Sequence, residues 1–335
     1  TAPSSKGYAM KLKKTLLGIA CLASLAAGAA QADFPNRDIR VIVPAAAGGG
    51  TDAIVRKVSN IAEESLPVSM YVENVEGGMT ATGLLQLMKA RPDGQTVAAI
   101  TYDSIITIPW KNMLPGFDMD KMRMIARITS EADAITVPEN SPYQTLDDLI
   151  AAAKKEPGSI RIGIQNMGAR THLTLLQLQD LTGAEFKIVS YDNSAASQKE
   201  ALLNGEVDAV VTSLGDLAPL IESGQARGLV EFSDTQNEGF PNVPPVTETD
   251  TGLDLQMGSF IVMVAPARTP DDVIEKLEAT YHEAYESDEF QQWLKKIGVT
   301  PAWLGADDVT EWANDTQQQL FDTMDELVDK GVLEK

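Results

Sequence analysis

Cysteine and histidine are scarce in this chain. Its 335 residues include one cysteine, Cys21, and two histidines, His172 and His282. Cys21 lies in a leader that we expect to be removed, which excludes a disulfide, a thiol nucleophile and a thiolate metal site. Two distant histidines leave little material for a metal pair or a Ser-His-Asp triad, and no G-x-S-x-G, H-E-x-x-H or EF-hand spacing occurs. We therefore expect a protein that is not an enzyme and has no catalytic residues, no metal and no cofactor.

Basic residues are also few. Lys and Arg number 27 against 48 Asp and Glu, which gives a formal charge of −21. This charge repels nucleic acids and anionic lipid surfaces and excludes them as partners. The surplus of acid is most simply a solubility feature. Local dipoles must then hold any anionic ligand against the repulsive electrostatic field of the protein. Salt screens this field beyond about 8–10 Å.

Long apolar runs are absent except near the N-terminus, where residues 10–32 have the three parts of an export signal. Lysines follow Met10, an apolar run extends from Thr15 to Ala27, and the small-residue site Ala30-Gln31-Ala32 comes next. No later segment approaches the roughly 20 apolar residues of a transmembrane helix. We expect cleavage after Ala32, with residues 1–9 upstream of the initiator, and a soluble mature protein in the periplasm.

Strand-like and helix-like segments alternate along the rest of the chain, which indicates an α/β fold with mainly parallel sheets. The mature length, about 300 residues, exceeds one ordinary core and favours two domains. Two apolar strands, Ala134–Val137 and Ser259–Val264, look long enough to cross between them as a hinge. The expected organisation is a clamshell with a ligand in its cleft, in which residues 1–32 are removed, residues 33–132 plus 253–335 form domain 1, and residues 133–252 form domain 2.

The same patterns give approximate bounds for the elements. Strands are expected at residues 39–43, 68–72, 96–101, 160–164, 186–189, 209–211, 228–231 and 260–264. Helices are expected at residues 52–65, 80–90, 145–155, 171–181, 195–203, 214–222, 270–286 and 306–330.

The segment from Ile39 to Val58, IRVIVPAAAGGGTDAIVRKV, carries the clearest local signal. A buried-strand pattern runs through a glycine-rich elbow into an amphipathic helix, with Thr51 or Asp52 as the expected N-cap. Such an elbow presents free backbone N–H groups and the positive end of a helix dipole to a small anion. The alternative is that the three glycines only make a tight turn. A second elbow, Val72–Gly83, repeats the arrangement, and both aim at one crevice if their strands are parallel neighbours.

The second half of the chain offers polar candidates of its own. Arg170 follows the strand 160–164 and could clamp a carboxylate with both arms of its guanidinium group, although a surface ion pair is an equally good interpretation. His172 is better explained as a packing or hydrogen-bonding residue than as a catalyst. Tyr191, Ser194, Thr212 and Ser213 could supply hydroxyl donors, but residues 192–194 also match ordinary turn and N-cap chemistry.

Six segments in order resemble the signatures of the substrate-binding proteins of tripartite tricarboxylate transporters, also called the Bug family. They are FPNRDIRVIVPAAAGGGTD, ARPDGQTV, GARTHL, YDNSAASQKEALLNGEVDAVV, FPNVPPVTETDTG and VAPARTPDDVIEKL. The resemblance implies a periplasmic-binding-protein clamshell with a deep cleft. In that family a ligand carboxylate is held mainly by backbone amides and small side chains, often through ordered waters.

Carried over by position, the resemblance implies contacts in both domains. In the first they are Ala45, Ala46, Gly49, Thr51, Asp52, Gly78, Met79, Thr80, Thr101, Tyr102 and Asp103. In the second they are Gln165, Gly168, Ala169, Arg170, Thr171, Tyr191, Asn193, Ser194 and Ser213. The chain departs from the family at residues 190–193, where many members have Pro-Tyr-Lys-Gly, and near Arg170, where Ser, Thr or Gly is common. Its first loop has alanines where an aromatic residue is common, and these changes bear on ligand identity.

The expected function is capture of a di- or tricarboxylate, or of an aromatic carboxylate, by a monomer that delivers it to integral-membrane permease subunits. The alternative is a receptor for a sensor kinase that uses the same fold. A third hypothesis, an exported hydrolase, would need Ser194 or Ser213 together with His172, and the sequence gives it little support.

Overall fold

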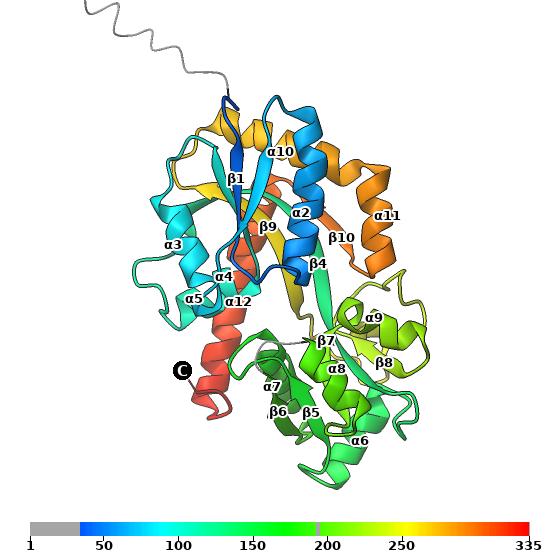
Figure 1. Cartoon of the computed structure of the whole chain (residues 1–335). Coiled ribbons are helices and arrows are strands. Elements are labelled where there is room, and N and C mark those ends of the chain that lie inside the picture. The colour runs from blue at the N-terminus through cyan, green and yellow to red at the C-terminus, as the bar shows by residue number, and fades with distance from the viewer. Residues whose placement is uncertain (1–33, 192–194, 335) are drawn as a thin grey trace, which may run out of the picture.

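The computed structural model describes residues 34–191 and 195–334. The expected signal peptide and Cys21 lie outside the described residues. The chain forms two lobes, one above the other in Figure 1, and one strand, β4 (Met122–Pro138), runs through both. Lobe 1 contains β1, β2, β3, β9, β10 and the first part of β4. Lobe 2 contains β5, β6, β7, β8 and the last part of β4.

The sheet of lobe 1 combines parallel and antiparallel pairs. β1 (Ile39–Val43) lies between β2 (Met70–Asn74) and β3 (Thr96–Ile100) and is parallel to both, with Ile39 opposite Met70. β9 (Gly258–Pro266) joins β3 to β4 in antiparallel pairs, and β10 (Pro301–Leu304) pairs with the outer side of β4. β1 and β3 are almost wholly apolar and buried because helices cover both faces of this sheet.

The helices of lobe 1 divide between these two faces. One core cluster joins the sheet to α2 (Gly50–Ala62), α10 (Asp271–Glu286) and α11 (Asp288–Ile297). The other joins it to α3 (Ala81–Lys89), α4 (Tyr102–Ile105), α5 (Thr107–Trp110) and α12 (Ala306–Asp329). α12 is the long red helix of Figure 1, and it reaches down to lobe 2.

Lobe 2 repeats the strand–helix alternation on a smaller scale. β5 (Arg161–Ile164) is parallel to β6 (Lys187–Ser190) and β7 (Ala209–Ser213), while the end of β4 is antiparallel to β7 and to β8 (Ala226–Glu231). Its helices are α6 (Leu146–Lys155), α7 (Arg170–Thr182), α8 (Ala195–Leu203) and α9 (Leu214–Glu222). The helix starts are set locally, as at α6, where Thr145 and Asp148 form a capping box.

The hinge between the lobes is built around Asp133 of β4. The backbone N–H of Asp133 donates to the carbonyl of Met257 at 2.7 Å, and its carbonyl accepts from Phe232 N–H at 2.7 Å. The expected strand Ala134–Val137 is therefore the last part of a much longer strand. β9 itself lies in lobe 1, because its pairing with β4 ends at Gly258 opposite Ala132, and the chain returns just before it.

Several elements are not indicated by the sequence patterns. They are α4, α5, α11, β10 and the first part of β4. Most are short, and β10 is held by long-range pairing with β4. The α/β class and the crossing strand are confirmed, but parallel pairing is confined to β2–β1–β3 and β6–β5–β7, and the middle of the sheet is antiparallel.

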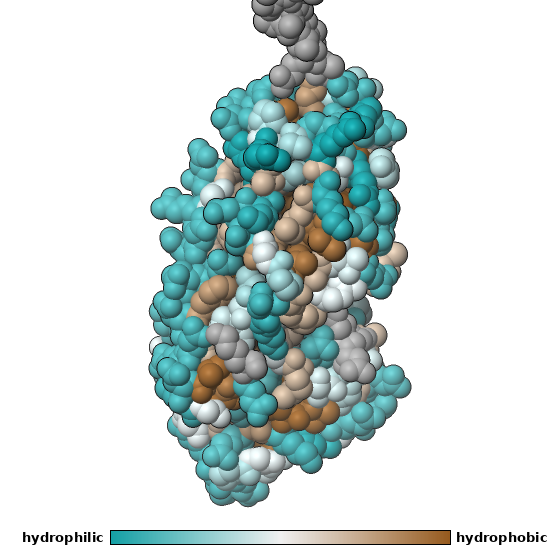
Figure 2. Space-filling view, turned by 90° about the vertical axis from the view of Figure 1, so that its left-hand side faces the viewer, coloured by the Kyte–Doolittle hydropathy of each residue, from teal (hydrophilic) through white to brown (hydrophobic). Residues whose placement is uncertain are grey.

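Within the described residues, no helix has both the length and the apolar character needed to cross a membrane. The face of the molecule shown in Figure 2 is largely hydrophilic, as the surplus of acidic residues leads one to expect.

Candidate binding site between the lobes

The loop after β1 carries the first group of predicted residues. Gly49 is the N-cap of α2, which corrects the expected Thr51 or Asp52, and no side chain caps this helix. The helix starts earlier because the glycines let the backbone turn before the first side chain that could cap it. Ala45 and Thr51 are half-buried, whereas Ala46, Gly49 and Gly50 are exposed. The first N–H groups of α2 therefore lie at an accessible positive helix end, which can bind an anion without a cationic side chain.

Asp52, in the same loop, already has its own partners. Its carboxylate accepts hydrogen bonds from Gly48 N–H at 2.9 Å, from Arg56 at 2.7 Å and from Asn74 at 2.9 Å. Burial raises the pKa of Asp52, but these donors outweigh it and hold the pKa below its ordinary value. Asp52 thus fixes the shape of the loop, and Asn74 also donates to the carbonyl of Ala45 at 3.1 Å.

The second elbow, Gly78–Thr80, has an unusual backbone. Met79 and Thr80 have φ angles of 62° and 153°, in the region that favours glycine. Such conformations cost about 1–3 kcal/mol each and persist where the surroundings impose them, often at binding sites. Here the Ser104 hydroxyl donates to Thr80 Oγ1 at 3.2 Å, and Thr101 N–H donates to Ser104 Oγ at 3.3 Å. The loops after β2 and β3 are therefore joined at the start of α4.

The loop before α7 brings the corresponding residues of lobe 2. Ala169 is the N-cap, and Thr171 Oγ1 accepts from Gln165 N–H at 3.0 Å. His172 Nδ1 accepts from Gly168 N–H at 2.9 Å. Burial, and then the charge of Lys111, lower the pKa of His172 to about 4, so that the ring is a neutral acceptor. The hydrogen-bonding role expected for His172 is confirmed.

Arg170 stands where α7 meets the hinge. Its guanidinium group forms an ion pair with Asp133, whose side chain is fully buried. The Thr174 hydroxyl donates to the other oxygen of Asp133 at 2.6 Å. Burial lowers the pKa of Arg170, and the nearby charges of Asp103, Asp216 and Glu131, together with Tyr102, oppose this. The guanidinium group is therefore surrounded by carboxylates of this chain. Sequence reasoning missed Asp133 and Glu131, although two acids inside a strand were a signal.

The lobes also touch beside this group. Lys111, at the end of α5, lies directly against Gly168, whose φ is 74°, and a Cβ at Gly168 would collide with the lysine ammonium. Burial raises the pKa of Asp103, and the hydrogen bond from Thr107 and the charges of Arg170 and Lys111 only partly oppose this. The N-terminal residues of α4 and α7 are thus brought together, as the clamshell predicts.

The remaining predicted residues are distributed unevenly. Ser213 caps α9 by accepting from Asp216 N–H at 3.3 Å, and Gln165 Nε2 donates to Thr212 Oγ1 at 3.2 Å. The Tyr191 hydroxyl donates instead to Glu206 at 3.5 Å, and its ring packs with the α8 cluster of lobe 2. Asn193 and Ser194 lie outside the described residues.

Glu131 predicts a pH-dependent stability. Burial, and then the charge of Asp216, raise its pKa from 4.5 to about 7, with Glu231 acting in the same direction and Arg170 and the Ser213 hydrogen bond opposing. The folded state therefore holds this proton more tightly than the unfolded chain. Its stabilising contribution is full below pH 4.5 and is lost as the pH rises through 7.

We expect the melting temperature of the wild type, relative to Glu131→Gln, to fall as the pH is raised from 5 to 8. Thermal unfolding of both proteins across this range measures the difference. Parallel curves would contradict the assignment, because the glutamine variant removes only this titration.

The fold is that of a periplasmic binding protein. A TctC solute-binding protein from Polaromonas has a TM-score of 0.76 at 24% identity, covering 88% of this chain and 100% of that one. Two Rhodopseudomonas palustris proteins have a similar structure. One, solved with adipate, has a TM-score of 0.76 at 22% identity, covering 88% of this chain and 98% of that one. The other, solved with bound malate, has a TM-score of 0.72 at 20% identity, covering 87% of this chain and 99% of that one. At these identities the likeness establishes the fold alone.

Sequence comparison identifies the family. The profile described as "Tripartite tricarboxylate transporter family receptor" matches residues 54–327. A UPF0065 protein of Bordetella pertussis is 30% identical over 296 residues, 87% of this chain and 90% of that protein. A UPF0065 protein of Cupriavidus necator is 27% identical over 307 residues, 91% and 90% of the two chains. This chain belongs to the tripartite tricarboxylate transporter receptor family, TctC, as the resemblance in its sequence indicated.

Proposed function

We propose that this protein binds a small carboxylate between its lobes and delivers it to a tripartite tricarboxylate-type permease. The observation that carries the proposal is the N-terminus of α2, which is exposed and has no side-chain cap. It lies at the carboxyl end of β1, next to the loops after β2 and β3. Solved proteins of the same fold were crystallised with adipate and malate, which supports a carboxylate as the ligand class.

The lobes would act as the two closing domains, with residues 33–132 plus 253–335 in one and residues 133–252 in the other. β4 and the segment around Met257 form the hinge, and closure would bury the ligand against both sets of helix N-termini. A permease could then distinguish the loaded protein from the empty one by its shape.

In this proposal the ligand carboxylate is bound mainly by backbone amides. Arg170 is paired with Asp133, so we assign to it the positioning of α7 and a contact with the ligand that is shared with Asp133. Asp52 holds the loop after β1, and the Tyr191 hydroxyl donates to Glu206. We propose that the other predicted contact residues of both lobes, including Asn193 and Ser194, have the roles given by the resemblance.

Catalysis does not belong to this function. The hydrolase hypothesis needs Ser194 or Ser213 next to His172, and Ser194 lies outside the described residues. The Nδ1 of His172 accepts from Gly168, and Ser213 hydrogen-bonds with Asp216 and Glu131. Both side chains are thus committed to holding loops and helix ends. We propose a monomeric binding protein of the periplasm, exported by residues 10–32, with no metal or cofactor.

The test is ligand binding by residues 33–335, measured by calorimetry and thermal shift with adipate, malate, citrate and benzoate. A ligand at 100 times its Kd should add about 2.7 kcal/mol to the stability of the folded state. We expect a saturable shift with one carboxylate class and none with adipamide, the uncharged analogue of adipate. A shift with nucleotides alone, or with no carboxylate, would contradict the proposal.

The sensor-kinase alternative predicts the same binding but a different partner. Co-purification of the ligand-loaded protein with the permease subunits encoded beside it would support uptake. Neighbouring genes that encode a sensor kinase and no permease would favour signalling.

A further inference from the structure

A cavity lies on the reverse side of the hinge, between the strands β4 and β9 and the helix α12. Its volume is about 610 Å³, which is within the range of small-molecule pockets. Along β4, Ser130 and Ala132 line this cavity, whereas Glu131 and Asp133 belong to the group around Arg170. Successive strand residues point to opposite faces, so the hinge strand lies between the cavity and the group around Arg170, and Tyr102 borders both.

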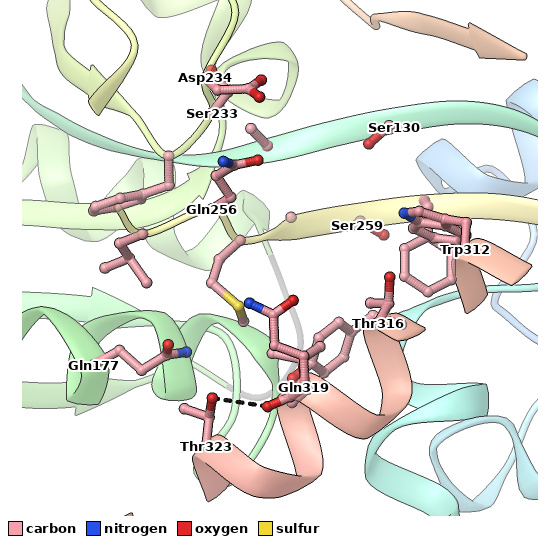
Figure 3. Close-up of a pocket in the computed structure, with 18 of the residues that line it drawn as sticks. Ser130, Gln177, Ser233, Asp234, Gln256, Ser259, Trp312, Thr316, Gln319 and Thr323 are labelled. Carbon is pink, nitrogen blue, oxygen red and sulfur yellow. Dashed lines mark hydrogen bonds between the residues drawn. The ribbon is translucent and has the colours of Figure 1, made fainter. Parts of the chain in front are cut away.

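The interior of the cavity is polar but uncharged. Ser130 and Ser259 come from the two strands, and Thr316, Gln319 and Thr323 follow along one side of α12 (Figure 3). Their spacing of three and four residues puts them on one face of that helix. The aromatic rings of Phe260 and Trp312 lie at one end, 4.8 Å apart and edge to face.

Two donors that line this cavity have no hydrogen-bond partner and are shut off from solvent. They are the hydroxyl of Tyr102, a residue that is 3% exposed, and the side-chain Nε2 of Gln177. Figure 3 shows Gln177 reaching from α7 toward the residues of α12. An unsatisfied buried donor costs about 1–3 kcal/mol, and a ligand acceptor oxygen that reaches such a donor would remove this cost.

The charges near the cavity define which ligand fits. The acids at its mouth, Asp234, Asp254 and Asp315, are exposed and repel an anion. Arg127 already has partners within the protein. Its Nε donates to the carbonyl of Ala302 at 3.0 Å, and its guanidinium carbon lies 4.6 Å from the centre of the Trp312 ring. The unpartnered donors inside need acceptor oxygens, which a simple cation lacks. Hydroxyl groups donate as well as accept, and so match the serines, threonines and amides.

We propose that this cavity is a second ligand site, which binds a neutral polyhydroxylated small molecule, a polyol or sugar, between α7 and α12. Its two unpartnered donors belong to different lobes, so the ligand bridges them. The same face of α7 carries Arg170 and Thr174 at the hinge, Gln177 in the cavity and Asp180. Asp180 pairs at 2.7 Å with Lys330, the C-cap residue of α12. An occupant therefore favours one arrangement of the lobes. The site stands without the proposed function, whereas its coupling to carboxylate binding rests on it.

The experiment is equilibrium dialysis of radiolabelled sorbitol against residues 33–335 with no carboxylate present. We expect saturable binding that weakens about tenfold in Gln177→Leu, since one hydrogen bond is lost. Gln318→Leu is the matched control, because Gln318 is exposed on α12, pairs with Asp322 and does not line the cavity. It should bind sorbitol as the wild type does.

Tyr102→Phe removes the second donor and keeps the ring, and we expect it to weaken sorbitol binding about as much as Gln177→Leu does. Absence of saturable binding, or equal binding by wild type and Gln177→Leu, would overturn the proposal, and binding of tetramethylammonium in place of sorbitol would overturn the ligand class. The coupling predicts a several-fold change in the Kd of the carboxylate when sorbitol is saturating. Sorbitol binding without any carboxylate binding would leave this site standing and refute the proposed function. The reverse result would refute this site alone.

Discussion

Asp133→Ala should lower the free energy of unfolding by about 3–5 kcal/mol, the usual cost of removing one partner of a buried ion pair. Asp133 is fully buried and Arg170 is only 11% exposed, so the variant removes the ion-pair partner of the guanidinium group and leaves it only the charge interactions with Asp103, Asp216 and Glu131. It also removes the acceptor of the Thr174 hydroxyl. Urea unfolding followed by circular dichroism measures the change.

The matched control removes both charges together. In Asp133→Leu with Arg170→Met, neither partner of the ion pair is left alone, although Asp103, Asp216 and Glu131 lose the nearby charge of Arg170, and we expect part of the lost stability to return. A single variant as stable as the wild type would contradict the pairing. A double variant no better than Asp133→Ala would mean that the hydrogen bond from Thr174, rather than the charge, holds the hinge.

Gly50→Pro should weaken carboxylate binding roughly ten- to a hundredfold. Gly50 is the first residue of α2, and proline there removes one N–H group from the proposed anion site, a loss of about 1.5–3 kcal/mol for a hydrogen bond to a charged group. The fold should tolerate it, because proline is favoured at the first helical position and Gly49, with φ −77° and ψ 170°, is already extended as a residue before proline must be.

Gly50→Ala is the control for this experiment. It keeps the N–H group, and an added Cβ at Gly50 meets nothing within 4 Å. Calorimetry with the carboxylate identified above should give a Kd close to that of the wild type. If proline and alanine affect binding equally, the amides at the start of α2 do not hold the ligand.

The elements that the sequence predicted are those whose pattern is complete within the element. The strand Ile39–Val43 and the helix that follows Thr145 have their buried faces and caps in a few consecutive residues. The first part of β4 was not predicted, because it mixes Arg123, Arg127 and Glu131 with apolar residues and so lacks a strand pattern of its own. Arg127 is accommodated only by the ring of Trp312 and the carbonyl of Ala302, both distant in sequence.

In the candidate site, too, the local features were predicted from the sequence and the long-range contacts were not. The elbows were predicted because glycine-rich turns between strand and helix act through their own backbone. The roles of individual side chains were not predictable from the sequence. The carboxylate of Asp52 accepts hydrogen bonds from Gly48 and Asn74, and the hydroxyl of Tyr191 donates to Glu206. A hydrogen-bond partner is chosen by packing, and packing depends on residues far along the chain.

The sequence by itself determined the family, the α/β class and the glycine-rich turn from β1 into α2, because each of these depends on order along the chain or on local backbone geometry. Only the tertiary structure decided that Arg170 faces Asp133, that Lys111 lies against Gly168, and that a cavity lies behind the hinge. The strand β4 brings together elements that are far apart in the sequence. These contacts decide which charges face each other and where a cavity remains, and no local sequence pattern is long enough to predict them.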